Sequence, residues 1–195
     1  MRQCDLSERV FNDRVMAVRE AGKTTMPVVT VHVREATPDD AEGIVKVLNP
    51  IIEAGTYTVL DTLMTVDTQR SYVLNASPRG VFHVAIDPAD GSVVGFQNAQ
   101  PIAAYTHAFD HVCDMGTYVA LARWRQGIAS QLFRASFEAL VTKGFEKIHT
   151  FVRADNPVSL QTYQHHGFQI VGVAVRHARV LGRYVDETII EKFLL

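Results

Sequence analysis

The chain has 195 residues, of which 47% are hydrophobic and 21% charged, and its formal net charge at pH 7 is −2. This is the composition of a globular protein, and a chain without a basic patch is not expected to bind nucleic acid. Its two cysteines are too few for a disulfide framework, and no apolar stretch approaches the roughly 20 residues of a membrane span. The amino-terminal residues also lack the apolar core of a secretory signal. We therefore expect a soluble, cytoplasmic protein that binds neither membranes nor nucleic acid.

The first 27 residues differ in pattern from the rest of the chain. Several apolar residues could share one helical face before Gly22–Pro27 interrupts the pattern, namely Val10, Phe11, Val15 and Val18. We interpret residues 1–27 as an amino-terminal extension with a linker, and residues 28–195 as one domain.

The domain begins with a strand, two helices and a hairpin. Residues 28–36 alternate as a strand does, and residues 37–55 have helical periodicity, with Thr37 as N-cap and Pro38 in the first turn. Pro50 is expected to kink or divide this helix. Residues 67–75 predict a second short helix, and residues 80–87 and 92–105 predict two antiparallel strands joined by the turn 88–91.

The second half alternates between strands and helices. We expect a strand over 109–121, a helix from 128 to about 144, a strand over 147–153 and a helix over 156–167. Residues 168–176 and 184–195 predict the closing strands. This order, with strands both adjacent and separated by helices, indicates an α+β fold in which helices are layered on a sheet.

The junction between the fourth strand and the third helix carries positive charge and a glycine. Arg123, Arg125 and Gly127 lie between the strand end near residues 119–121 and the helical pattern that begins at Ile128. A helix N-terminus offers unpaired N–H groups and a partial positive charge, and glycine permits close approach to the backbone. These features suit an anion such as a diphosphate. They are equally compatible with an ordinary strand–helix connection whose arginines are solvated.

A second motif spans residues 156–168, with the sequence NPVSLQTYQHHGF. Asn156 is placed to cap a helix, Pro157 to occupy its first position and Gly167 to end it. Ser159 and Tyr163 are four residues apart, so they share one face of that helix.

Both segments resemble signatures of the GNAT acetyltransferases. Residues 124–129 (WRQGIA) are similar to the pattern Gln/Arg-x-x-Gly-x-Gly/Ala, although Trp124 replaces the usual first residue. Residues 156–168 match Asn-x-x-Ser/Ala-x-x-x-Tyr-x-x-x-Gly-Phe at every named position. The resemblance covers roughly residues 29–195. It implies the GNAT acyl-CoA N-acyltransferase fold, which is a central mixed, mostly antiparallel sheet with helices on both faces.

The resemblance also implies a cofactor and site residues. In the family, backbone amides of the first motif bind the pyrophosphate of acetyl-CoA, and the tyrosine of the second protonates the leaving thiolate. Tyr163 is therefore the candidate general acid, although it could also be a core tyrosine. The backbone N–H of Val119 is the candidate donor to the thioester oxygen. The residues implied to contact the coenzyme are Val119, Leu121, Arg125, Gln126, Gly127, Ile128, Ala129, Ser130, Asn156 and Ser159.

Residues 48–67 and 178–194 further resemble the phosphinothricin and methionine sulfoximine N-acetyltransferase branch. This implies a homodimer that transfers acetyl directly, in a ternary complex, to the amino group of a small amino-acid-like or amine substrate. The branch usually carries a glutamate base where this chain has Asp114. The resemblance makes Asp114 the candidate general base, which is one methylene shorter and would act through a water. A carboxylate that caps a turn or is simply exposed is the alternative. Residues 100–105 (QPIAAY) lack the Pro-Trp-Arg that the herbicide-type enzymes carry near this position.

Other residues bear on two further functions, metal binding and non-catalytic binding of a coenzyme or effector. His107, His111, Cys113 and Asp114 have metal-ligand chemistry, but a turn at residues 109–110 and their close spacing do not suit zinc, so no metal is expected. The replacement at Trp124 and the short Asp114 also fit a non-catalytic module of the same fold that binds coenzyme A or an effector.

Overall fold

The computed structural model describes residues 28–103 and 105–194, and it contains a seven-stranded sheet in the order β1-β2-β3-β4-β5-β7-β6. β4 and β5 run parallel, and the other neighbouring strands run antiparallel. The strands are β1 His32–Glu35, β2 Val81–Ile86, β3 Val93–Pro101, β4 Val112–Val119, β5 Lys147–Arg153, β6 Gln169–Val180 and β7 Arg183–Phe193. The helices are α2 Ala41–Glu53, α3 Val66–Leu74, α4 Ile128–Thr142 and α5 Pro157–His165, with 3-10 turns at Pro38–Asp40, His107–Phe109 and Leu121–Arg123. The predicted α+β fold and order of elements are confirmed.

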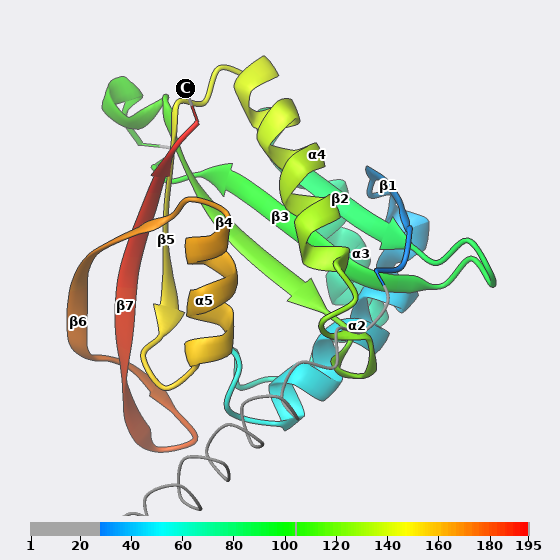
Figure 1. The fold of residues 1–195 in the computed structure, drawn as a ribbon, viewed down its shortest axis with the longest axis horizontal. Coiled ribbons are helices and arrows are strands. Elements are labelled where there is room, and N and C mark those ends of the chain that lie inside the picture. The colour runs from blue at the N-terminus through cyan, green and yellow to red at the C-terminus, as the bar shows by residue number, and fades with distance from the viewer. Residues whose placement is uncertain (1–27, 104, 195) are drawn as a thin grey trace, which may run out of the picture.

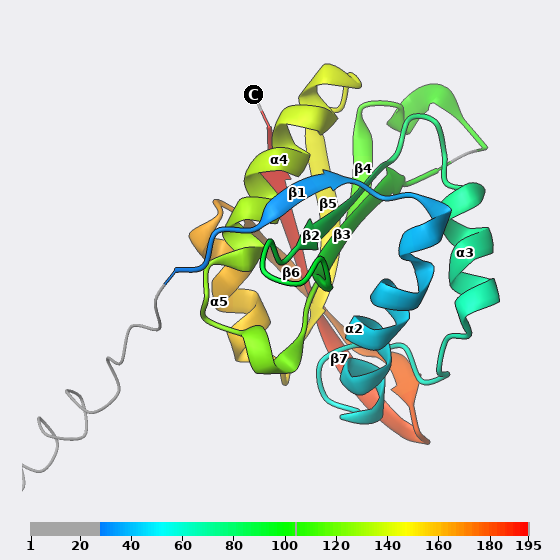
Figure 2. The ribbon, with the colours of Figure 1, turned by 90° about the vertical axis from the view of Figure 1, so that its right-hand side faces the viewer.

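The helices cover the sheet from both sides. α4 and α5 lie on one face, and α2 and α3 lie on the other (Figures 1 and 2). Phe133 of α4, Tyr163 of α5 and Ile148 of β5 belong to one buried cluster, whereas Ile44 of α2 and Phe96 of β3 belong to another. The sheet therefore has two separate hydrophobic layers, one beneath each pair of helices.

Several boundaries differ from the sequence prediction: β3 ends at Pro101 rather than at residue 105, β4 begins at Val112 rather than at residue 109, and β6 extends to Val180 rather than to residue 176. β1 begins at His32 rather than at residue 28, because the segment before it is bonded to the start of α4. The first helical residues form a 3-10 turn, in which Asp40 accepts hydrogen bonds from the Thr37 N–H and from Arg34. Pro50 lies inside α2 and does not divide it. Val47 and Leu48 before it and Ile51 and Ile52 after it are buried in the cluster that includes Phe96 of the sheet, and this packing outweighs one missing hydrogen bond.

The parallel pairing of β4 and β5 is short. It comprises Val112 with Lys147 and Cys113 with Ile148, after which the two strands diverge (Figure 1). Beyond the paired residues a gap opens between β4 and β5. The Thr150 hydroxyl donates to the Met115 carbonyl across it at 2.9 Å. Further along β4, Ala120 donates to Val94 of β3. Because backbone groups alternate sides along a strand, the N–H of the preceding Val119 points away from β3, toward the gap.

The predicted extension, residues 1–27, lies outside the described residues, so the proposed domain boundary stays a prediction. None of the helices in residues 28–103 and 105–194 is long and apolar enough to cross a membrane.

Candidate active site

The start of α4 is shaped by two residues with left-handed backbone conformations. Arg125 has φ 60° and Gly127, the N-cap of α4, has φ 75°. A Cβ on Gly127 would lie 3.0 Å from Cγ1 of Val28, so a side chain there would be both strained and crowded. The helix begins at Ile128, as predicted, and the first-turn N–H groups of residues 128–130 have no intrahelical acceptor. This turn can bind an anion through its backbone amides.

Gln131 connects the segment before β1 to this turn through hydrogen bonds. Its Nε2 donates to the carbonyls of Val29 at 2.8 Å and Gly127 at 3.3 Å, and its Oε1 accepts from the Val31 N–H at 3.1 Å. The Val29 N–H also donates to the Gln126 carbonyl at 3.0 Å. Sequence reasoning missed Gln131, because its partners lie about a hundred positions away.

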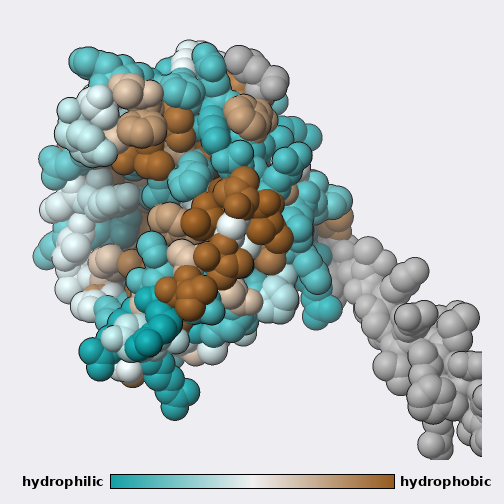
Figure 3. All heavy atoms as spheres, turned by 90° about the vertical axis from the view of Figure 1, so that its left-hand side faces the viewer, coloured by the Kyte–Doolittle hydropathy of each residue, from teal (hydrophilic) through white to brown (hydrophobic). Residues whose placement is uncertain are grey.

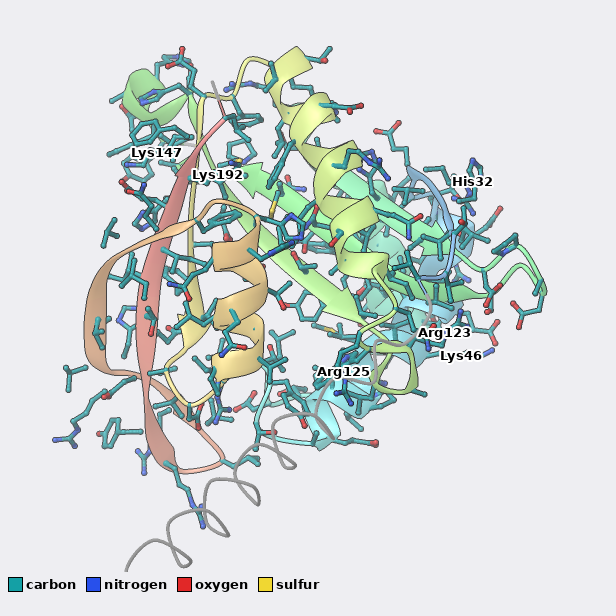
Figure 4. All side chains as sticks on the ribbon, viewed as in Figure 1. His32, Lys46, Arg123, Arg125, Lys147 and Lys192 are labelled. Carbon is teal, nitrogen blue, oxygen red and sulfur yellow. The ribbon has the colours of Figure 1, made fainter. Side chains whose placement is uncertain are left out.

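The side chains of Arg123 and Gln126 bond to each other and to a distant loop. Arg123 donates through Nε to Gln126 Oε1 at 2.8 Å and through Nη1 to Asp87 at 2.6 Å. Arg123 is therefore committed within the protein, and so is Oε1 of Gln126, whereas Arg125 is exposed near the first turn of α4 (Figure 4). Arg125 is placed to meet an incoming anion, and the predicted contact of Gln126 stays a prediction.

Trp124 closes the end of β4. Its indole Nε1 donates to the Val119 carbonyl at 2.9 Å, and its ring lies edge-on to Tyr57 with the centroids 4.8 Å apart. A partly buried indole N–H needs an acceptor, and Val119 supplies it. The tryptophan at this position thus has a structural role. It binds the Val119 carbonyl and not the Val119 N–H, which points toward the gap between β4 and β5. Leu121, predicted as a coenzyme contact, begins the intervening 3-10 turn.

A groove of about 630 Å³ runs from the start of α4 toward the end of α5. Its lining includes Gly127, Ser130, Arg134 and His166. The Ser130 hydroxyl lies 3.1 Å from Nε2 of His166, whose ring stacks on Phe133. Burial, with nearby positive charge, lowers the pKa of His166 and favours its neutral form. Arg134 and His166 were not predicted as site residues, since neither is a specified position in the two motifs.

Tyr163 is buried between α5 and β4, with 5% of its surface exposed. Its hydroxyl donates to Oγ1 of Thr117 at 3.1 Å, and its ring makes edge contacts with Phe133 and Phe168. A tyrosine phenol is protonated at neutral pH, and burial raises the pKa of Tyr163 further. The side chain is thus both a core residue and a protonated group beside the diverging strands.

Asn156 is committed to local structure. Its Oδ1 accepts from the Ser159 N–H at 3.1 Å, which caps α5 as predicted, and its Nδ2 donates to the Tyr57 carbonyl at 3.3 Å. Ser159 is half-buried in the first turn of the helix. The buried Arg153, which the sequence did not single out, donates to the carbonyls of Gly55 and Thr58. Together Asn156 and Arg153 attach the loop after α2 to the end of β5.

Asp114 lies on the opposite face of the sheet from Tyr163. It is exposed and pairs with Gln100, and alternation along β4 places it on the other side from Thr117. The nearby Tyr72 hydroxyl accepts from Asn98 at 3.0 Å. Burial and the Asp114 charge raise the pKa of Tyr72. The candidate base and the candidate acid therefore approach the strand gap from opposite sides.

The four candidate metal ligands do not converge. Cys113 is buried with its thiol donating to the Lys147 carbonyl, whereas Asp114 points to the other face. His107 pairs with Asp110 at 3.0 Å within the turn between β3 and β4. Within residues 28–103 and 105–194, no three His, Cys, Asp or Glu side chains are grouped closely enough to hold a metal ion.

Comparison with known proteins identifies the family. Residues 52–168 match the family model described as the acetyltransferase (GNAT) family. The match spans more than half of the chain, so the chain belongs to the GNAT acetyltransferases. No curated protein matches the sequence.

Solved structures share the fold at low identity. A phosphinothricin acetyltransferase from Sinorhizobium meliloti in complex with acetyl-CoA has a TM-score of 0.77 at 18% identity, covering 85% of this chain and 89% of that one. A ribosomal-protein-alanine N-acetyltransferase from Brucella melitensis also has a TM-score of 0.77, at 21% identity, covering 83% and 99%. A GCN5-related N-acetyltransferase from Kribbella flavida has 0.72 at 24% identity, covering 84% and 97%. All three are less than 25% identical to this chain, so the likeness shows the fold alone.

Proposed function

We propose that this acetyltransferase transfers the acetyl group of acetyl-CoA directly to the amino group of a small amino-acid-like or amine substrate. The observation that carries the proposal is the position of the Tyr163 hydroxyl. It is buried and protonated beside Thr117 of β4, where β4 has diverged from β5. A protonated phenol is what a leaving thiolate needs at this point.

The residues at the start of α4 fit the pyrophosphate of the coenzyme. Gly127 supplies a turn that no other residue could form without strain, and the amides of Ile128, Ala129 and Ser130 point outward from the helix start. Arg125 would add a positive charge. The bound coenzyme supplies the activated acetyl group. The Val119 N–H would donate to the thioester oxygen and so favour attack by the amine.

Asp114 is the proposed base on the acceptor side. A free α-amine has a pKa of about 7.7–8.0, so roughly a tenth of it is neutral at pH 7, and only modest help from a base is needed. A lysine-type amine, with a pKa of about 10.4, would need much more. An exposed aspartate that acts through water therefore favours an amino-acid-like acceptor. The absence of Trp and Arg from residues 100–105 indicates that another group binds the carboxylate, if the acceptor has one.

A homodimer remains part of the proposal. β6 forms an edge of the sheet, and its exposed apolar side chains include Ile170, Val171, Val173 and Val175. Figure 3 shows apolar atoms gathered on the side of the molecule where β6 lies. An apolar edge strand is a surface that proteins usually cover. Sedimentation of the purified protein measures its oligomeric state, and a monomer at micromolar concentration would contradict this part.

The activity is tested by thiol release from acetyl-CoA with a panel of amino acids and amines. Turnover with an acceptor supports the enzyme, and Tyr163→Phe is expected to lower kcat by about 10²- to 10⁴-fold with little change in coenzyme affinity. Coenzyme binding without turnover on any amine would favour a non-catalytic binding module instead.

A further inference from the structure

Three polar side chains form a partly buried chain of hydrogen bonds from β3 through β4 to α5. Gln97 of β3 is fully buried and donates through Nε2 to Oγ1 of Thr117 at 2.7 Å. The Tyr163 hydroxyl donates to the same oxygen at 3.1 Å. The antiparallel register places Gln97 directly opposite Thr117, so strand pairing fixes the first of these contacts.

Packing alone does not account for this chain. Its surroundings are apolar, and Met115, Phe133 and Phe168 belong to the same buried cluster as Tyr163. Oε1 of Gln97 is buried without a hydrogen-bond partner among the described residues. An unsatisfied buried oxygen costs about 1–3 kcal/mol, and an apolar side chain at residue 97 would avoid that cost. Gln97 is therefore better explained by what its amide does to Thr117.

The effect of Gln97 on Thr117 follows from the hydrogen bonds that the Thr117 hydroxyl can make. A threonine hydroxyl has two lone pairs and one proton. In the resting arrangement the two lone pairs accept from Gln97 and Tyr163, so the Thr117 proton is not used toward either of them. When Tyr163 gives its proton to the coenzyme thiolate, its O–H bond breaks, an S–H bond forms and the phenol oxygen becomes an anion. The Thr117 hydroxyl can then turn and donate to that anion, while Gln97 still donates to Oγ1.

We propose that Thr117 is a positioning residue that stabilises the phenolate of Tyr163 during proton transfer, and that Gln97 orients Thr117 for this task. The inference rests on the proposed role of Tyr163 as the acid. The phenolate regains its proton from solvent after the thiol leaves, which balances the proton that the acceptor amine gives up. Hydrogen bonds to an ionised group are about twice as strong as those between neutral groups, so Thr117 favours the ionised state over the resting one.

Thr117→Val removes the hydroxyl and keeps the shape of the side chain. We expect kcat to fall by about 10- to 100-fold, the effect of losing one hydrogen bond to a charged group, with the KM for acetyl-CoA changed less than twofold. Thr117→Ser restores the hydroxyl and is expected to recover most of kcat. The matched control is Thr188→Val in β7, a threonine on a sheet strand that is buried and lies outside this chain of hydrogen bonds.

A double-mutant cycle distinguishes positioning from a general effect on the fold. In a Tyr163→Phe background, Thr117→Val should not lower kcat further, because no phenolate can form for Thr117 to stabilise. Gln97→Met provides a second variant that removes both the donor and the unpaired oxygen, so it is expected to fold. It should lower kcat less than Thr117→Val does, and likewise have no effect in the Tyr163→Phe background.

The outcomes separate this inference from the proposed function. If Tyr163→Phe loses activity but Thr117→Val and Gln97→Met match the wild type, Thr117 has no positioning role and the inference is wrong. Losses that multiply in the double mutants would also overturn it. If Tyr163→Phe itself keeps full turnover, the acid role fails first, and the proposed function must be revised at that step.

Discussion

At the scale of single residues, the site depends on a few side chains whose chemistry is altered by their surroundings. Trp124 stands where the family usually has Gln or Arg, and it binds the Val119 carbonyl instead of an anion. Burial raises the pKa of Tyr163 further above its ordinary value. Gly127 can adopt φ 75° beside Val28 because it has no Cβ. The relevant properties are the indole donor of Trp124, the buried phenol of Tyr163 and the missing Cβ of Gly127.

Gly127→Val is expected to weaken the binding of coenzyme A by at least tenfold. The new side chain would strain the left-handed turn and collide with Val28, so the amides at the start of α4 would shift. Isothermal titration of the purified variant with coenzyme A measures the affinity. Gly144→Val is the matched control, because Gly144 also has a positive φ, of 84°, but has open space around it and lies at the other end of α4. Equal affinities for the two variants would argue against the pyrophosphate assignment.

Cys113 is expected to resist thiol reagents in the folded protein. Burial, with a smaller effect of the Asp114 charge, raises the pKa of its thiol to about 12, and its side chain is fully buried. The thiolate is the reactive form, so little of it is present at pH 8. In a Cys4→Ser variant, a chromogenic disulfide should label Cys113 only after denaturant is added. Rapid labelling of the native protein would show that this strand opens, and it would also complicate assays that follow thiol release.

At the scale of elements, the loop after α2 is held by the end of β5. Arg153 donates to the carbonyls of Gly55 and Thr58 and forms a bidentate pair with Asp155. Asn156 adds a bond to Tyr57, which contacts Trp124. The loop, the end of β4 and the start of α5 are therefore mechanically connected around the strand gap.

Arg153→Met is expected to lower the free energy of unfolding by about 1–3 kcal/mol, because two loop carbonyls lose a buried charged donor. The KM for the acceptor should rise more than the KM for acetyl-CoA, since the loop lies on the face that carries Asp114. Chemical denaturation and steady-state kinetics measure the two effects. Arg70→Met removes an exposed pair with Asp67 within one helix and should change stability by less than about 0.5 kcal/mol. A similar loss in both variants would contradict the specific role of Arg153.

At the scale of the whole molecule, the segment before β1 completes the start of α4. Val29 and Val31 are bonded to Gln126 and Gln131, although the chain positions are far apart. The segment from Val29 to Val31 is thus attached to the start of α4 before the first strand begins.

Two truncations test this boundary. A chain that starts at Pro27 should keep the melting temperature and coenzyme affinity of the full protein, whereas one that starts at His32 should lose both in part. Saturating coenzyme at 100 times its Kd stabilises a folded protein by about 2.7 kcal/mol, which raises Tm by roughly 5–10 °C for a domain of this size. The His32 variant should show a smaller rise, measured by thermal shift. Loss of folding in the chain that starts at Pro27 would mean that residues 1–26 belong to the core.

The sequence by itself determined the order of elements and the local ends of the helices. Thr37, Gly127 and Asn156 mark helix starts through capping and backbone preferences, which act between neighbours and can be recognised in a sequence. The same reasoning could not decide between a kink and a division at Pro50, because the packing of Ile51 and Ile52 that keeps α2 in one piece is not a local property.

Only the tertiary structure decided how the site is assembled. The divergence of β4 from β5, the bonds of Gln131 to the segment before β1 and the chain from Gln97 through Thr117 to Tyr163 all join residues far apart in sequence. Such contacts depend on which strands become neighbours, and no periodicity within one segment encodes that choice. The motifs could therefore indicate where the coenzyme binds, whereas the groups that position the acid became visible only once the strands were paired.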